Sequence, residues 1–214
     1  MSVHLSPEEI EALSFTIIDA EAGAHPWSPA EWSVVRRAIH TSADFDYARN
    51  MYFSPGALAK GVSALRRGRV VVTDTHMALS GIAKPRLNRF GCAAACFVAD
   101  ADVARQAKAL GITRSIVALR KGASDPAARV FVIGNAPTAL FELIRLIREE
   151  GLRPDLIVGL PVGFVGAAES KEALLALQEQ VPEVPFITSR GRKGGSNVAA
   201  AVLNALLILA EEGF

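Results

Sequence analysis

The sequence predicts an α/β fold: a five-stranded, largely parallel, doubly wound sheet in three layers (α/β/α), with an N-terminal helical annex. Two observations predict it. From residue 70 onward, five short apolar or β-branched runs each end in a turn containing Gly, Asp or Asn, and most are followed by a segment of helical periodicity. Before residue 70 the chain shows helix start signals instead. Because continuous apolar strands between helices are typical of βαβ units, we expect a parallel sheet covered on both faces.

The first third carries three helix start signals. Ser6-Pro7-Glu8-Glu9 and Ser28-Pro29-Ala30-Glu31 both fit the capping box, in which a serine caps the helix, proline follows and glutamate stands at the third helical position. They predict helices near 7–22 and 29–40. Ser54-Pro55 predicts a third helix that ends near Arg67.

The later part alternates strands and helices. The strands are expected at the five apolar runs 70–73, 95–98, 130–133, 156–159 and 186–189. Helical periodicity is clearest in 137–150, 167–180 and 195–211. This alternation predicts crossover helices that join parallel strands.

The composition is that of a globular chain, with 214 residues, 50% of them hydrophobic and 21% charged. We expect one domain over 1–214, made of a helical part at 1–68 and βα repeats at 69–214. The net charge of +1 provides no overall field that would attract nucleic acid or an anionic membrane. The most apolar stretch, 198–210, is too short for a membrane span and contains Asn204. The first twenty residues lack a secretory signal pattern, so a cytoplasmic location is expected.

Four loops follow the predicted strands, at 74–76, 134–138, 159–166 and 189–196. In an open parallel sheet, ligands bind beyond the carboxyl ends of the strands. Small residues and helix N-termini in these loops predict a cleft lined for an anion. The alternative for Gly159, Gly163 and Gly166 is a tight turn that packs a helix close to the sheet. The P-loop and dinucleotide fingerprints are missing, which counts against a phosphate-ligand enzyme on this scaffold.

The last of these loops reads Arg190-Gly191-Arg192-Lys193-Gly194-Gly195-Ser196. Three cations within four residues repel one another, and an anion between them would relieve that repulsion. A solvated surface loop also tolerates such a cluster at modest cost. The sequence therefore favours an anion site here and leaves the solvated loop as its alternative.

Histidines are the first candidates for proton transfer near neutral pH. His4 and His25 lie in a tail and a turn, and His76 follows a strand beside Asp74. His40 ends the helix whose apolar stripe carries Trp32, Val35 and Ile39; a helix C-terminus favours the charged imidazolium, and the nearby arginines disfavour it. The alternative for His40 is a polar-face histidine that faces water.

Several motifs together resemble the precorrin-8X methylmutase family. They are the segments Ser14-Phe15-Thr16-Ile17-Ile18-Asp19, Arg37-Ala38-Ile39-His40-Thr41-Ser42, Val72-Thr73-Asp74-Thr75-His76-Met77, Ile133-Gly134-Asn135-Ala136-Pro137-Thr138, Leu160-Pro161-Val162-Gly163-Phe164-Val165-Gly166 and the Arg190–Ser196 loop. The match runs nearly end to end. It implies an isomerase of cobalamin biosynthesis, a pathway of porphyrin-type tetrapyrroles. Such an enzyme moves a methyl group from C11 to C12 of precorrin-8X or cobalt-precorrin-8. The product is hydrogenobyrinate or cobyrinate.

The resemblance also implies how the site is built. It implies His40 as the catalytic acid and base, no cofactor and no metal. The residues expected to bind the tetrapyrrole substrate and corrinoid product are Ser14, Arg114, Asn135, Thr138, Arg190 and Arg192. Arginine forks suit the carboxylates around such a macrocycle. A non-enzymatic tetrapyrrole carrier is the alternative outside enzymes.

The family further implies a homodimer. The residues add one argument, because the N-terminal part carries the aromatic side chains Trp27, Trp32, Phe45, Tyr47 and Phe53. Aromatic residues are enriched in interface cores. The competing interpretation is that these rings complete the core of a single chain. Asp44, directly after the histidine helix, offers no identified role, and the partner that orients His40 is left open.

Overall fold

A six-stranded sheet forms the centre of the protein. The computed structural model describes residues 5–214. The strand order is β1-β6-β5-β4-β2-β3, and every neighbouring pair is parallel except β1 and β6. The strands are β1 (Met51–Phe53), β2 (Val70–Thr73), β3 (Ala94–Ala95), β4 (Ala128–Ile133), β5 (Leu156–Gly159) and β6 (Phe186–Ser189).

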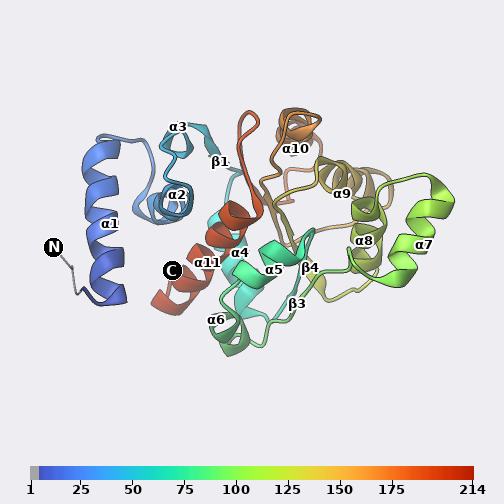
Figure 1. Cartoon of the computed structure of the whole chain (residues 1–214), viewed down its shortest axis with the longest axis horizontal. Helices are drawn as coiled ribbons and strands as arrows, with labels where there is room; N and C mark the ends of the chain where they lie inside the picture. Colours follow the sequence, from blue (N-terminus) through green and yellow to red (C-terminus); the bar gives the residue numbers. More distant parts are fainter. Residues whose placement is uncertain (1–4) are drawn as a thin grey trace.

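Helices cover both faces of this sheet, which confirms the doubly wound α/β prediction (Figure 1). One face carries α4 (Ala57–Arg66), α11 (Ser196–Glu212) and α2 (Pro29–Ser42). The other carries α8 (Arg114–Ala123), α9 (Pro137–Glu149) and α10 (Ala167–Gln180). The remaining helices are α1 (Pro7–Ala22), α3 (Tyr47–Asn50), α5 (His76–Gly81), α6 (Lys84–Arg89) and α7 (Ala101–Leu110). Helices α1 and α7 lie at opposite ends of the long axis in Figure 1.

Side chains that alternate between the two faces of the sheet divide the core into two layers. Val130 and Val132 of β4 face α11 and α2, whereas Phe131 and Ile133 face α9. All four side chains are fully buried, as expected for a strand covered on both sides. None of the helices described within residues 5–214 combines the length and apolarity that crossing a membrane requires.

The sheet has six strands rather than the predicted five. The additional strand, β1, lies in the part expected to be helical and pairs antiparallel with β6. It covers an edge that β6 would otherwise expose, and edges are commonly protected in this way. Three residues are too few for a periodic pattern, so hydrophobic periodicity could not predict this strand. The strand expected at 95–98 is also shorter and earlier, as β3.

The aromatic residues of the N-terminal part pack into the chain's own core. Trp32 and Tyr47 are buried, and Trp27, Phe45 and Phe53 pack against the same cluster. The competing interpretation of these rings is therefore correct, and they give no support to a dimer.

The chain order creates a switch point at the sheet centre. From β2 the chain adds β3 on one side and then β4 on the other. Connections leave these two strands in opposite directions, and ligands of open α/β sheets bind beyond the carboxyl ends of strands at such a point. Asp74 follows β2 and Gly134 follows β4, which puts both predicted loops at this edge.

Candidate functional site

The carboxylate of Asp74 binds three backbone N–H groups at the switch point. Its two carboxylate oxygens accept hydrogen bonds from the N–H groups of Gly134, Asn135 and Ala136 at 2.7–2.9 Å. Burial raises the pKa of the Asp74 carboxyl and outweighs the opposing effect of these three donors. The N–H groups of the turn before α9 are thus paired with the protein's own carboxylate. These three N–H groups are therefore not available to an external anion, and a phosphate site on this turn is disfavoured.

Two loop glycines allow the backbones of neighbouring loops to pack closely together. A Cβ atom on Gly134 would lie 2.6 Å from Cα of Ser196, and one on Gly194 would lie 2.2 Å from the carbonyl oxygen of Leu160. Neither contact leaves room for a side chain. At these two glycines the backbones of neighbouring loops are in direct contact, so the loops hold one another in place.

His40 lies exposed near the C-terminal end of α2, whose Trp32, Val35 and Ile39 are buried as predicted. The next residue, Thr41, accepts a hydrogen bond through its carbonyl from Asn197 Nδ2 at 3.3 Å. Asn197 stands in the first turn of α11, at the carboxyl edge of the sheet. The fold therefore brings this end of α2 to the predicted cleft.

The other histidines differ from His40. His25 stacks on Trp32 with ring centroids 3.9 Å apart, and His76 is exposed in the first turn of α5. His4 lies outside the described residues. His76 also follows a residue that contacts the N-terminus of α11, because Thr75 Oγ1 lies 2.8 Å from Ser196 Oγ.

A line of contacts connects the α11 N-terminus to the predicted ligand residues on the other face. Ser196 Oγ lies 2.8 Å from Thr75 Oγ1, directly after Asp74. Thr138 Oγ1, one turn after Asn135, lies 3.0 Å from Thr113 Oγ1, which caps α8. Asn135 and Arg114 are exposed, and Arg114 begins α8. Asn135, Thr138 and Arg114 are therefore brought together at the carboxyl edge.

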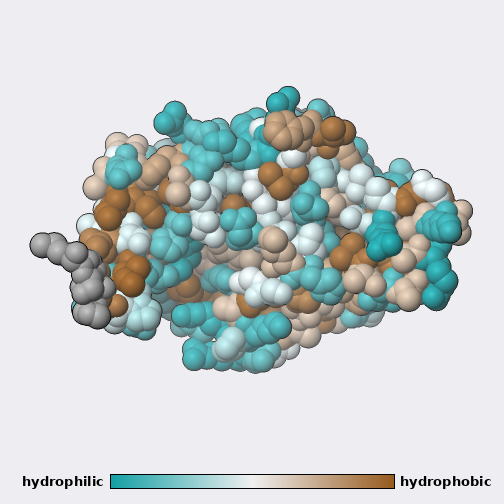
Figure 2. Space-filling view, viewed as in Figure 1, coloured by the Kyte–Doolittle hydropathy of each residue, from teal (hydrophilic) through white to brown (hydrophobic). Residues whose placement is uncertain are grey.

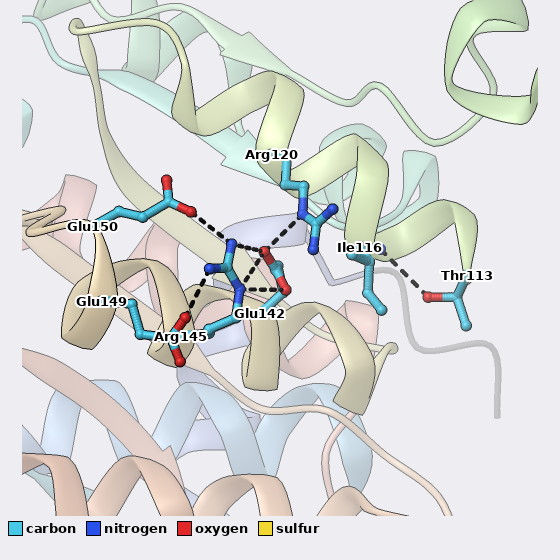
Figure 3. A network of polar contacts seen from close by, with 7 residues as sticks. All are labelled: Thr113, Ile116, Arg120, Glu142, Arg145, Glu149 and Glu150. Carbon is cyan, nitrogen blue, oxygen red and sulfur yellow. Dashed lines mark hydrogen bonds and ion pairs between the residues drawn. The ribbon is translucent and has the colours of Figure 1, made fainter. Parts of the chain in front are cut away.

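Helices α8 and α9 are clamped together by a buried carboxylate (Figure 3). Glu142 accepts hydrogen bonds from Arg120 Nε at 2.8 Å and from Arg145 Nη2 at 2.6 Å. Burial raises the pKa of Glu142, but these two arginines outweigh burial and hold that pKa below its ordinary value. The clamp fixes α8 against α9, and with them Arg114 and Thr138.

A cavity of about 960 Å³ lies beside this clamp, lined by Arg120, Arg129, Arg145 and Arg153 among others. It opens near Gly151 and Leu152, before β5 begins, and so belongs to the amino edge of the sheet. His40 and Asn135 lie at the carboxyl edge. Arg145 is already paired with three glutamates, so we assign this cavity no part in the site.

The cations of the 190–193 loop have different partners. Lys193 Nζ lies 2.6 Å from a carboxylate oxygen of both Asp44 and Asp46, and Arg190 Nη1 lies 3.8 Å from Glu172. Arg192 has no carboxylate partner within residues 5–214; its guanidinium carbon lies 5.7 Å from the ring centre of Phe164. Internal carboxylates thus relieve most of the repulsion that seemed to require an anion. Arg192 remains available to a ligand.

Sequence reasoning missed a residue that holds this loop. Lys171 of α10 is fully buried, and its Nζ donates to the carbonyl of Lys193 at 2.6 Å and to Ser189 Oγ at 3.4 Å. Burial lowers the pKa of Lys171 to about 8. A lysine in the apolar pattern of a helix was the available signal, because lysine is rarely fully buried without a specific partner.

Ser14 is half-buried in α1, and its Oγ donates to the carbonyl of Ile10 at 2.8 Å. The next residue, Phe15, contacts the His40 ring, so Ser14 belongs to the part of α1 beside that histidine. Within residues 5–214, no group of three or more His, Cys, Asp or Glu side chains is placed to hold a metal ion.

Exposed apolar side chains also lie at the carboxyl edge of the sheet. Phe164 and Val165, in the loop after β5, are 84% and 90% exposed. This loop is tied to the arginine loop, because the N–H of Gly163 donates to the carbonyl of Arg192 at 3.3 Å. The carboxyl edge therefore offers histidine side chains, arginines that make no ion pair within residues 5–214, and apolar surface.

Comparison with known proteins decides the family. The sequence profile of the CbiC family, described as precorrin-8X methylmutase, matches residues 9–209. The chain belongs to the precorrin-8X methylmutase family. The resemblance inferred from the motifs is thereby confirmed.

Individual family members agree over nearly the whole chain. The cobalt-precorrin-8 methylmutase of Priestia megaterium is 47% identical over 209 residues, covering 98% of this chain and 91% of that protein. The enzyme of the same name from Leptospira interrogans is 48% identical, covering 95% and 94%. The crystal structure of the precorrin-8X methylmutase from Thermus thermophilus superposes with a TM-score of 0.87 at 41% identity, covering 96% and 97%.

Proposed function

We propose that this chain is a methylmutase that moves a methyl group from C11 to C12 of precorrin-8X or cobalt-precorrin-8, with His40 as general acid and base. The product is hydrogenobyrinate or cobyrinate. The observation that carries the proposal is the placement of an exposed histidine at the carboxyl edge of a sheet in a member of this family. His40 precedes Thr41, which contacts Asn197 in the first turn of α11. The expected ligand residues Asn135, Thr138 and Arg114 lie after β4 and at the start of α8.

The edge suits a broad apolar ring system with carboxylates around its rim. Arg114 and Arg192 are exposed and make no ion pair within the described part of the chain, so both forks can bind carboxylates. Asn135 adds an exposed side-chain amide. Phe164 and Val165 supply apolar contact area.

The chemistry requires little from the protein besides proton transfer and alignment. In a [1,5]-sigmatropic shift the bond from the methyl group to C11 breaks as the bond to C12 forms, and the π system rearranges. Atoms and electrons balance without a co-reactant. His40 donates a proton or hydrogen bond to the ring system and takes the proton back when the shift is complete. A rigid cleft holds the conjugated ring in the reactive geometry.

The test uses purified protein and both substrate forms. We expect the visible spectrum to change to that of the extended product chromophore without added nucleotide or S-adenosylmethionine. His40→Ala is expected to lose turnover and still bind product. Equal turnover by wild type and His40→Ala would contradict the role of His40. Binding without turnover by the wild type would instead favour a tetrapyrrole carrier.

We also propose that the chain is a homodimer and that α1 contributes to its interface. Ile10, Leu13 and Ile17 recur every three or four residues along α1, and each is about half exposed, at 51%, 50% and 48%. Figure 2 shows hydrophobic side chains gathered over this end of the molecule. An unpartnered apolar stripe of this kind is typical of an interface helix.

A further inference from the structure

We propose that Phe15 is a positioning residue that fixes the imidazole of His40. This inference rests on the proposed function, in which His40 transfers the proton. Catalytic histidines are usually oriented by a hydrogen bond to one ring nitrogen. Within residues 5–214 the His40 imidazole has no such partner. Its ring instead meets the ring of Phe15, with centroids 5.4 Å apart and planes at 68°.

The edge-to-face geometry gives this contact a preferred orientation. Aromatic rings attract in this arrangement because the positive edge of one ring meets the negative face of the other. His40 is exposed, whereas Phe15 is half-buried and packs against the main core cluster. Phe15 therefore provides a fixed wall for a side chain that solvent would otherwise leave free to rotate.

Phe15 is itself held by two cations. The guanidinium carbons of Arg36 and Arg37 lie 4.2 and 5.0 Å from its ring centre. Cations at these distances from an aromatic ring are attracted by its negative face. Both arginines precede His40 by about one turn of α2, so the phenyl ring rests on the same helix as the imidazole.

The carboxylates of α1 hold these arginines in turn. Arg37 binds both oxygens of Glu11 at 3.0 and 3.3 Å, and Arg36 binds Asp19 at 2.9 Å. Asp19 also accepts from Trp32 Nε1 at 2.8 Å. The hydrogen bond from Arg37 lowers the pKa of Glu11, so this carboxyl stays charged. Helix α1 is thereby clamped along α2, with Phe15 between the two ion pairs.

Kinetics and product binding separate orientation from affinity. We expect Phe15→Leu to lower kcat by about 10- to 100-fold, because a misplaced acid–base group costs rate. Its Kd for product should stay within about 3-fold of wild type. Phe15→Tyr keeps the ring and should restore kcat. Phe90→Leu is the matched control: Phe90, which follows α6, is a partly buried core aromatic with no ring contact to Phe15 or His40 within residues 5–214, and its loss should leave kcat unchanged.

Nuclear magnetic resonance tests the contact without turnover. The imidazole C–H signals of His40, assigned by their loss in His40→Gln, should shift in Phe15→Leu and stay in Phe90→Leu, because an adjacent ring perturbs them. Light scattering and thermal unfolding verify that the Phe15→Leu protein has the same mass and stability as wild type. If it does not, the same measurements are made on Phe15→Met.

The outcomes distinguish the two proposals. Unchanged His40 signals, or an unchanged kcat in the leucine variant, would overturn the role of Phe15. An equal loss of kcat in the leucine and tyrosine variants would overturn it as well. A wild-type protein without turnover on either substrate would instead overturn the proposed function, while the His40 signals would still decide whether Phe15 fixes the ring.

Discussion

Lys193 Nζ lies 2.6 Å from Asp44 Oδ2, which ties the segment after the histidine helix to the arginine loop. The hydrogen bond from Lys193 is the main reason that the pKa of Asp44 is lowered, and Asp46 pairs with the same ammonium. Neither residue had an identified role in the sequence. Together they position the turn after His40 against the loop that carries Arg192.

The ion pairs of this loop predict how much each arginine contributes to product binding. Arg192→Leu and Arg114→Leu should each weaken product binding by about 10- to 100-fold, since each removes a charge-assisted hydrogen bond worth roughly 1.5–3 kcal/mol. Arg190→Leu should have a smaller effect, because Glu172 already shares that guanidinium. The measurement is a product titration followed by absorbance.

Arg148→Leu serves as the control for this series. Arg148 is exposed on α9 towards the amino edge, and no ion pair involves it in the described structure. Its replacement should leave product affinity unchanged. If Arg148→Leu and Arg192→Leu weakened binding equally, the carboxylate-binding role of Arg192 would be wrong.

Asp74→Asn should destabilise the fold. The amide nitrogen of asparagine cannot accept the N–H groups that one carboxylate oxygen now binds, so at least one buried donor loses its partner. The expected loss in the free energy of unfolding is about 1–3 kcal/mol, measured by urea denaturation. Asp102→Asn breaks an exposed pair with Lys121 and should cost less stability than Asp74→Asn, because solvent screens that pair. Equal losses would contradict a special role for Asp74.

Lys171 should make stability depend on pH. Burial lowers its pKa from 10.5 to about 8, and the neighbouring carboxylate of Glu172 opposes this effect. Between these two values the unfolded chain binds more protons than the folded chain, so the free energy of unfolding should rise as pH increases. Below pH 8 both states are charged and the full cost of burying the ammonium is present.

Urea denaturation of wild type and Lys171→Met across that pH range isolates this effect. Other groups titrate in both proteins, so the difference between the two curves is the quantity that reports on Lys171. We expect the rise with pH in wild type to be missing from the variant. Parallel curves would show that the Lys171 ammonium is not penalised by burial.

The sequence predicted regular elements better than polar contacts. The bounds of β5 and α10 match the prediction, because a continuous apolar run or a long periodic segment sets them locally. The loops at the carboxyl edge were also predicted, since parallel strands end on one side. The sequence could not show which polar groups are already paired. Asp74 caps a turn 60 residues away, and Lys193 binds Asp46 across 147 residues.

The dimer prediction concerns the apolar stripe of α1. Leu13 stands at its centre between Ile10 and Ile17, and a glutamate there would place a charge inside a closed interface. We expect wild type to have twice the 22.7 kDa chain mass by light scattering at micromolar concentration, and Leu13→Glu to have the single mass. Leu110→Glu is the matched control, because Leu110 is 60% exposed at the end of α7, far from α1. A dimeric Leu13→Glu protein would exclude α1 from the interface, and a monomeric wild type would contradict the homodimer itself.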